Sequence, residues 1–205
     1  MKIYYLTAIA FTLAALAIFS VTESQPAAES LPAQQLNDYP AQDIELRAKL
    51  LIAEAGGKQS IRSSRSLQGL MEEANRIWRQ AGIMFAVTDI AYTNIEPDTL
   101  HDAVNGSPSG LASVEGYEPD KINLLFVPEI PGGLNGISFP SYRAALIADS
   151  TTANSYRTVA HELGHILRLR HSPYPERLMY TGTNGELLAE EEISFARFVV
   201  SEYFG

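Results

Sequence analysis

Three of the four histidines of this 205-residue chain lie within one stretch, HELGHILRLRH, which begins at His161 and ends at His171. If the stretch is helical, His161 and His165 lie about 40° apart around the axis and one turn apart along it. Both imidazoles then face the same side and can reach one metal ion. The fold must therefore present this helical face to a place that an ion can enter, which constrains the chain more than any other feature.

Glu162 lies on the same broad face, one residue away from the histidine pair. This offset predicts that its carboxylate lies beside a water on the metal and acts as a base, rather than as a ligand. An HExxH pattern also arises by chance on amphipathic helices, but His171 argues against chance. On a continuing helix His171 would stand about 9 Å beyond His165, so the helix must end for it to become the third ligand of a zinc site with one open position.

With these residues and the downstream Met179, the chain resembles the metzincin metalloproteases, whose pattern is HExxHxxGxxH followed by a turn that contains methionine. The resemblance implies that His161, His165 and His171 bind Zn²⁺, that Glu162 is the catalytic base and that Met179 belongs to the Met-turn. Tyr180 follows the methionine directly, whereas relatives with a tyrosine ligand place it two residues after, so it is not assigned as a ligand.

Arg168 departs from the family pattern, which has glycine at this position. Glycine is favoured there because the helix ends at a residue with positive φ, which costs a residue with a Cβ about 1–2 kcal/mol. Two alternatives follow: Arg168 adopts this conformation at that cost, or the helix ends in a different way.

The first 24 residues have a basic start at Lys2 and a long apolar run, as in a secretory signal peptide or an uncleaved signal anchor. Either one predicts an exported protein, secreted or periplasmic, with a membrane association only if the segment is not cleaved. Residues 25–43 are rich in Glu, Gln, Pro, Ala and Ser and are interpreted as a linker or short pro-segment. Residues 44–205 are long enough to form one metalloprotease domain.

Net charge and cysteine content limit the classes of partner that this protein can bind. The formal net charge of −9 argues against nucleic acid or an anionic membrane surface as a partner. The absence of cysteine excludes a disulfide framework and a cysteine that caps the metal as an inhibitor. The expected partner is a protein or peptide substrate, and the sequence does not indicate an oligomeric state.

Apolar periodicity predicts the elements of the first half of the domain. Residues 44–52 alternate as a strand with one buried face, and residues 66–81 follow the spacing of a helix that Gly82 ends. Trp78 is predicted to be core, and residues 83–87 alternate as a second strand. Residues 94–118 predict a surface loop with at most a short helical turn, in which His101 is an exposed side chain.

The second half is expected to build the cleft. Residues 121–127 are continuously apolar and predict a buried parallel strand. The resemblance, which extends to a run at residues 74–83 similar to bacterial metzincins, implies an antiparallel edge strand that borders the substrate cleft, followed by a strand at residues 143–148. The edge strand consists of Gly136, Ile137, Ser138 and Phe139. A helix from Asn154 or Ser155 should carry the histidine pair, and residues 189–203 should form a C-terminal amphipathic helix.

The predicted fold class is α/β (α+β), a metzincin-like zincin domain. Its expected parts are a mixed, mostly parallel five-stranded sheet, a backing helix, the active-site helix and the C-terminal helix. The expected function is zinc-dependent hydrolysis of peptide bonds by an exported endopeptidase, with Zn²⁺ as the cofactor.

Two alternatives stay open at this stage. In a gluzincin-type protease the third ligand would be a downstream glutamate, with Glu190, Glu191 and Glu192 as candidates. The other alternative is a catalytically inactive binding protein on the same fold, which the unusual Arg168 suggests.

Overall fold

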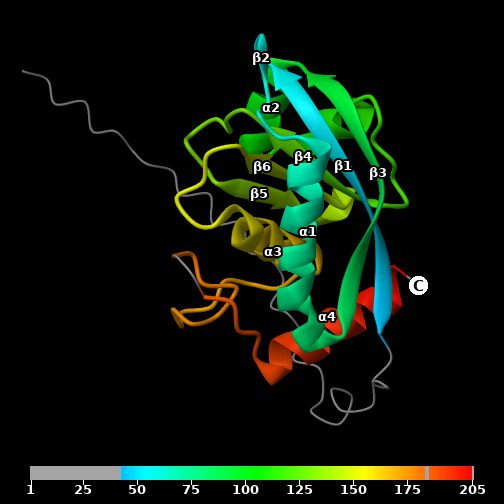
Figure 1. Ribbon diagram of the computed structural model, residues 1–205, viewed down its shortest axis with the longest axis vertical. Coiled ribbons are helices and arrows are strands. Elements are labelled where there is room, and N and C mark those ends of the chain that lie inside the picture. Colours follow the sequence, from blue (N-terminus) through cyan, green and yellow to red (C-terminus); the bar gives the residue numbers. More distant parts are fainter. Residues whose placement is uncertain (1–42, 183–184, 205) are drawn as a thin grey trace, which may run out of the picture. The chain divides into compact units, whose positions relative to one another are not determined.

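The computed structural model describes residues 43–182 and 185–204, so the predicted signal segment and nearly all of the predicted linker lie outside the described residues (Figure 1). The described chain forms six strands and four α-helices. The strands are β1 (Ile44–Ala55), β2 (Lys58–Gln59), β3 (Ile83–Ile95), β4 (Ile122–Val127), β5 (Gly136–Phe139) and β6 (Ala144–Ala148). The helices are α1 (Ser64–Trp78), α2 (Pro97–Val104), α3 (Ser155–Ile166) and α4 (Glu190–Tyr203). Short 3₁₀ turns follow at η1 (Arg79–Ala81), η2 (Pro108–Ser113) and η3 (Pro140–Tyr142).

All six strands belong to one mixed sheet. Strand β1 pairs in parallel with β3 and with β4, and β4 pairs in parallel with β6. Strands β1 and β2 pair antiparallel, and so do β5 and β6. The predicted count of five strands omitted β2, a two-residue strand that returns after Gly56 and Gly57, whose φ values of 59° and 74° form the tight turn.

The core lies on both faces of this sheet. In β1, Leu50 and Ile52 pack into the cluster that contains the buried faces of α1 and α3, whereas Leu51 and Ala53 pack into a second cluster with α2 and η2. The prediction of one buried face for this strand was therefore wrong from Ala48 onward. The central strands of a parallel sheet are covered on both sides. The alternation of burial is limited to the first residues of β1, where Glu45 and Arg47 are exposed and Leu46 is buried.

Helix α1 begins at a reciprocal capping box between Ser63 and Ser66 and ends at Trp78, and the turn η1 that continues it is ended by Gly82, whose φ is 61°. Trp78, predicted as core, is fully buried, and its indole Nε1 donates a hydrogen bond of 3.1 Å to the carbonyl oxygen of Ala160 in α3. This bond joins the backing helix to the helix that carries the histidine pair, and Figure 1 shows α1 crossing in front of α3.

The predicted loop at residues 94–118 is more ordered than expected. Strand β3 runs on to Ile95, α2 starts with Pro97 at its first turn, and Leu100 and Ala103 bury one face of that helix. His101 is exposed as predicted, but it lies on α2. The helix escaped prediction because eight residues give only two turns of apolar periodicity.

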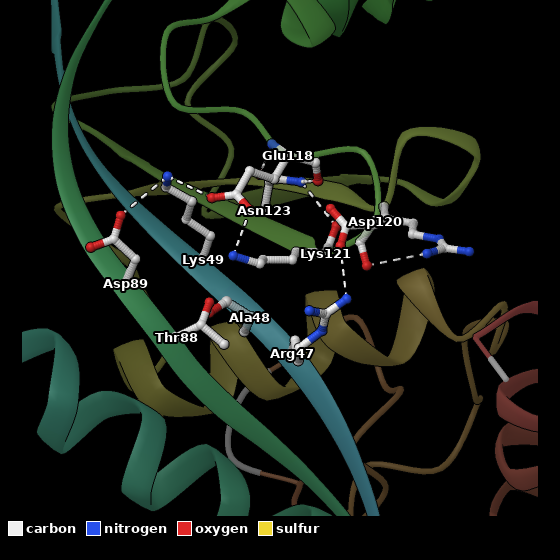
Figure 2. A network of polar contacts seen from close by, with 10 residues as sticks. Arg47, Ala48, Lys49, Thr88, Asp89, Glu118, Asp120, Lys121 and Asn123 are labelled. Atoms are coloured by element: carbon white, nitrogen blue, oxygen red, sulfur yellow. Dashed lines mark hydrogen bonds and ion pairs between the residues drawn. The ribbon is translucent and has the colours of Figure 1, made fainter.

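A network of polar contacts ties the segment before β4 to the sheet (Figure 2). The Lys49 ammonium, almost buried on β1, lies 2.8 Å from Glu118 and 3.1 Å from Asp89. Lys121 contacts the other oxygen of Glu118, and hydrogen bonds from Lys121 and Lys49 lower the pKa of Glu118 to about 2. The Asn123 side chain bonds both backbone groups of Glu118. Each charge in the network faces an opposite charge, which indicates a structural role.

Among the helices of residues 43–182 and 185–204, none combines the length and the apolar character that spanning a membrane requires.

Candidate metal centre

Helix α3 carries His161, Glu162 and His165, and it begins at Ser155 after Asn154, as predicted. Nine of its residues are buried, because the helix packs between α1 and strands β5 and β6. His161 and Glu162 are 7% and 5% exposed, respectively. Polar side chains at these positions lose their contacts with water on folding, so each requires a partner inside the protein.

The end of α3 turns the chain back toward the histidine pair. The backbone N–H of Arg168 donates to the carbonyl of His165, and that of Leu169 donates to the carbonyl of Gly164. This pair of bonds defines a Schellman motif with Arg168 at the position where glycine is usual. Arg168 has φ of 62°, so the first of the two alternatives predicted for this residue is confirmed.

A contact at the C-terminus accompanies the strained backbone of Arg168. Its guanidinium lies over the ring of Tyr203, 4.1 Å from the ring centre. Such a cation–π contact contributes about 0.5–1 kcal/mol at an exposed site, which offsets part of the cost of the positive φ. Arg143, the other non-glycine residue with positive φ in the described chain, stacks in the same way on Phe204 at 4.5 Å.

The turn after α3 brings His171 to the histidine pair. One ring nitrogen from each of His161, His165 and His171 lies within 4.8 Å of the others. The Nε2 atoms of His165 and His171 are 3.0 Å apart. Within the described ranges, these residues form the one cluster of three or more histidine, aspartate or glutamate side chains that could hold a metal ion.

Backbone carbonyls fix the orientation of two of these rings. The Nδ1 atom of His161 lies 2.8 Å from the carbonyl oxygen of Leu178, and that of His165 lies 2.9 Å from that of Leu169. A carbonyl oxygen only accepts, so both Nδ1 atoms must carry the proton. The Nε2 atoms are then left with free lone pairs, the form in which histidine binds a metal.

Burial also keeps these rings neutral. It lowers the pKa of His161 to about 4 and lowers the pKa of His165 and of His171. Neutral imidazoles bind a metal without first losing a proton.

The donor set fits zinc. Zinc bonds histidine nitrogens at about 2.0–2.1 Å in tetrahedral geometry, which places two such nitrogens about 3.3 Å apart. The 3.0 Å between the Nε2 atoms of His165 and His171 is close to this value. Three neutral nitrogens with one open position are typical of a catalytic rather than a structural zinc site.

Glu162 lies against the edge strand β5. Ser138 donates a hydrogen bond of 2.6 Å to its Oε2 atom. Gly136 lies so close that a Cβ there would be 2.7 Å from the Cγ atom of Glu162, so a side chain at position 136 would displace the carboxylate. Burial raises the pKa of Glu162 to about 7, against the hydrogen bond from Ser138 and the charge of Arg157, which lower it.

Strand β5 spans Gly136–Phe139 and is antiparallel to β6, as predicted. Among the described residues it pairs with no other strand, so it forms an edge of the sheet beside α3. The prediction grouped Ser138 with the substrate-binding residues, whereas the structure directs its hydroxyl to Glu162. The sequence could not show this contact, because it joins residues 24 positions apart.

Met179 is fully buried beneath the cluster. A Cβ at Gly164 would collide with its sulfur, so the methionine packs directly against α3 between the two histidines of the pair. The backbone N–H of Ser172 donates to the carbonyl of Met179 at 2.8 Å, which closes the loop that follows His171.

Glu190, Glu191 and Glu192, the alternative third ligands, occupy the first turn of α4. Glu192 accepts a hydrogen bond from the backbone N–H of Ala189 and so caps that helix. None of the three joins the histidines in a metal-binding cluster of the described chain. The geometry therefore favours His171 as the third ligand.

Sequence reasoning missed the groups that support the histidines, the carbonyls of Leu169 and Leu178 and the buried side chain of Arg157. Backbone carbonyls leave no signal in a sequence. Arg157 could have been identified from the sequence, because an arginine one turn before His161 on a helix must lie on the same helical face as that histidine.

The fold resembles known metallopeptidase structures at low sequence identity. The crystal structure of archaemetzincin from Methanopyrus kandleri matches 77% of this chain and 94% of its own, with a TM-score of 0.50 and 14% identity. Metalloproteinase-II from Bacteroides fragilis matches 81% of this chain and 60% of its own, with a TM-score of 0.52 and 15% identity. A chain in a structure of a chaperone-substrate complex matches 78% of this chain and 38% of its own, with a TM-score of 0.53 and 10% identity.

No family model and no curated protein matches the sequence. The similarity thus establishes a metallopeptidase-like fold, shared with an archaeal and a bacterial protein and not specific to the bacterial metzincins.

Proposed function

We propose that this protein is a zinc metalloendopeptidase of the metzincin type. The observation that carries the proposal is the convergence of three neutral histidine nitrogens beside the buried carboxylate of Glu162, at a free sheet edge. His161, His165 and His171 are the proposed ligands. Met179 is the proposed Met-turn residue, because it packs against the ligand-bearing helix from below.

A zinc ion held by these imidazoles would supply the Lewis acidity that polarises a peptide carbonyl and acidifies the attacking water. Glu162 would accept the proton of that water and pass it to the leaving amine. In the metal-free protein burial raises the pKa of this carboxyl to about 7, and a raised pKa favours the acceptance of a proton by a base. Ser138 would hold the carboxylate in place during both transfers.

The free edge of β5 supports an extended peptide as the substrate. Its outer backbone groups have no strand partner in the described chain, so a peptide can add there as a further antiparallel or parallel strand. The binding site would then consist of Gly136, Ile137 and Phe139, with Ser138 facing the catalytic base. A peptide bound in this way passes close to Glu162, because Gly136 contacts it.

We also propose that the protein acts outside the cytoplasm. The basic start and apolar run of residues 1–24 support export as a secreted or periplasmic protein, or one anchored by that segment.

The test is zinc analysis of the purified protein, together with mass spectrometry of a mixed peptide library after incubation. One zinc per chain with cleavage at internal peptide bonds is the expected result. Zinc without cleavage would favour the inactive binding protein, and a chain that binds no zinc would contradict the proposal.

A further inference from the structure

Arg157 is a buried arginine on α3, one turn before His161, and the proposed chemistry gives it no direct role. It is 4% exposed, and burial lowers its pKa. Within residues 43–182 and 185–204, no carboxylate forms an ion pair with it. The charges of Glu162 and Glu186 act on it only from beyond ion-pair distance. Burying a guanidinium without a direct ion pair is costly, so its hydrogen bonds must compensate for much of the lost hydration.

Three backbone carbonyls provide this compensation, and all belong to residues 178–182 and 185, called here the segment around Met179. The Nη2 atom of Arg157 donates to the carbonyl of Leu178 at 2.8 Å and to that of Tyr180 at 2.5 Å. The Nε atom donates to the carbonyl of Gly185 at 3.2 Å. The two carbonyls that flank Met179 therefore bind one nitrogen of Arg157. The described residues between His171 and α4 form only isolated β-bridges, and the bonds of Arg157 attach them to α3 together with those of His161 and Tyr156.

The carbonyl of Leu178 has two donors. It accepts from Arg157 at 2.8 Å and from the Nδ1 atom of His161 at 2.8 Å. Arg157 and His161 are four residues apart on one face of α3, and the carbonyl lies between their side chains. The same oxygen that Arg157 holds thus sets the protonated nitrogen and the orientation of the His161 ring.

We propose that Arg157 is a positioning residue for the metal centre. It fixes the Leu178 carbonyl, which orients His161 so that its Nε2 atom faces the ion, and it holds Met179 beneath the cluster. This inference rests on the proposed zinc site. It adds that the site depends on the buried guanidinium of Arg157, which would contact neither the metal nor the substrate.

The planar fork of arginine is required for this role. One planar guanidinium reaches three carbonyls with donors in fixed directions. The side chain of lysine is shorter, and its ammonium group lacks this fixed planar arrangement of donors. Arg157→Lys should keep the charge and part of the bonding, and Arg157→Met should keep the apolar stem alone.

The matched control is Arg62→Met. Arg62 also anchors α3, through hydrogen bonds to the carbonyl of Asp149 and the hydroxyl of Ser155 at the start of the helix. It lies in the loop before α1 and, among the described residues, bonds to Asp149 and Ser155 and not to the segment around Met179. Its loss therefore tests the effect of removing an arginine that anchors the start of α3.

The experiment measures three quantities for the full chain and each variant. These are the thermal unfolding of the metal-free protein, the zinc dissociation constant by competition with a chelator, and the visible absorption spectrum with Co²⁺ in place of zinc. Loss of a group that orients a ligand typically weakens metal binding 10–100-fold. Arg157→Met should show a loss of about that size and a changed Co²⁺ spectrum, Arg157→Lys a smaller loss, and Arg62→Met wild-type values.

Wild-type affinity and an unchanged Co²⁺ spectrum in Arg157→Met would overturn the inference while leaving the proposed function intact. If Arg157→Met does not fold, Arg157→Lys decides, since a folded lysine variant with wild-type affinity and spectrum would overturn it equally. If the wild-type protein itself binds neither zinc nor Co²⁺, the proposed function fails, and this inference fails with it.

Discussion

The hydroxyl of Ser138 donates a 2.6 Å hydrogen bond to the carboxylate of Glu162, and so joins the edge strand to the ligand-bearing helix. The same hydroxyl also lies 2.9 Å from the carbonyl oxygen of Glu162. The strand that is proposed to bind substrate is therefore also the element that holds the proposed base. A substrate that shifts β5 would therefore also shift the carboxylate of Glu162.

Ser138→Ala should lower turnover about tenfold, because a misplaced catalytic group loses much of its effectiveness. It should also cost about 1–3 kcal/mol of stability, since it leaves a buried carboxylate without its donor. Ser138→Thr, which keeps the hydroxyl, should retain most activity. Steady-state kinetics and denaturant unfolding measure both effects, and equal kcat values for wild type and Ser138→Ala would contradict the assigned role.

His171→Ala should weaken zinc binding by orders of magnitude and abolish peptide cleavage, because two protein ligands remain. The control is Glu192→Ala, which removes the cap of α4 and should leave zinc content unchanged. Metal analysis after dialysis against a weak chelator measures both. Loss of zinc in Glu192→Ala with retention in His171→Ala would restore the glutamate alternative.

Substitutions of Arg168 test the left-handed backbone conformation that ends α3. Arg168→Ala removes the contact with Tyr203 but keeps a Cβ at positive φ, so it should lower the free energy of unfolding by about 0.5–1 kcal/mol. Arg168→Gly removes the same contact and relieves the strain, so it should be about 1 kcal/mol more stable than the alanine variant. Chemical denaturation compares the pair, and a glycine variant no more stable than alanine would contradict the observed turn.

The raised pKa of Glu162 predicts a pH dependence of the metal-free protein. Its pKa is about 7 when folded, against an ordinary value of 4.5, so the folded state holds the proton more tightly. The resulting stabilisation is fully present below pH 4.5 and is lost as pH rises through 7, by about 3 kcal/mol in total. Glu162→Gln lacks this effect.

The measurement is the free energy of unfolding of metal-free wild type and Glu162→Gln at pH 5 and pH 8. Wild type should lose stability relative to the variant by about 2–3 kcal/mol over this range. The lowered pKa of His161 acts in the opposite direction below pH 6.5, but it is common to both proteins and cancels in the difference. Parallel pH profiles would show that Glu162 ionises normally.

The sequence predicted the parts of the site that depend on local geometry. The spacing of His161 and His165 follows from the helix alone, and the helix start at Ser155 and the strand at Gly136–Phe139 lie where they were expected. The positive φ of Arg168 was one of two alternatives that the family pattern left open, and the structure selects it. The histidine spacing and the helix start need only neighbouring residues, whereas the strand at Gly136–Phe139 was implied by the resemblance to the metzincins.

Long-range contacts were not predictable in this way. The bond between Ser138 and Glu162 and the bonds of Arg157 to the segment around Met179 depend on how separate elements pack. Strand β2 and helix α2 are short, so their apolar patterns were too brief to stand out. The burial of β1 on both faces depended on helices that lie far along the chain.

The central claim is that Glu162 is the base of a zinc-dependent peptidase. The most direct test is the zinc content and peptide turnover of Glu162→Gln beside wild type, with circular dichroism to confirm that both are folded. The amide keeps the shape of the side chain but cannot accept a proton, so the variant should keep one zinc per chain and lose nearly all turnover. Substantial hydrolysis by the zinc-loaded Glu162→Gln protein would contradict the claim.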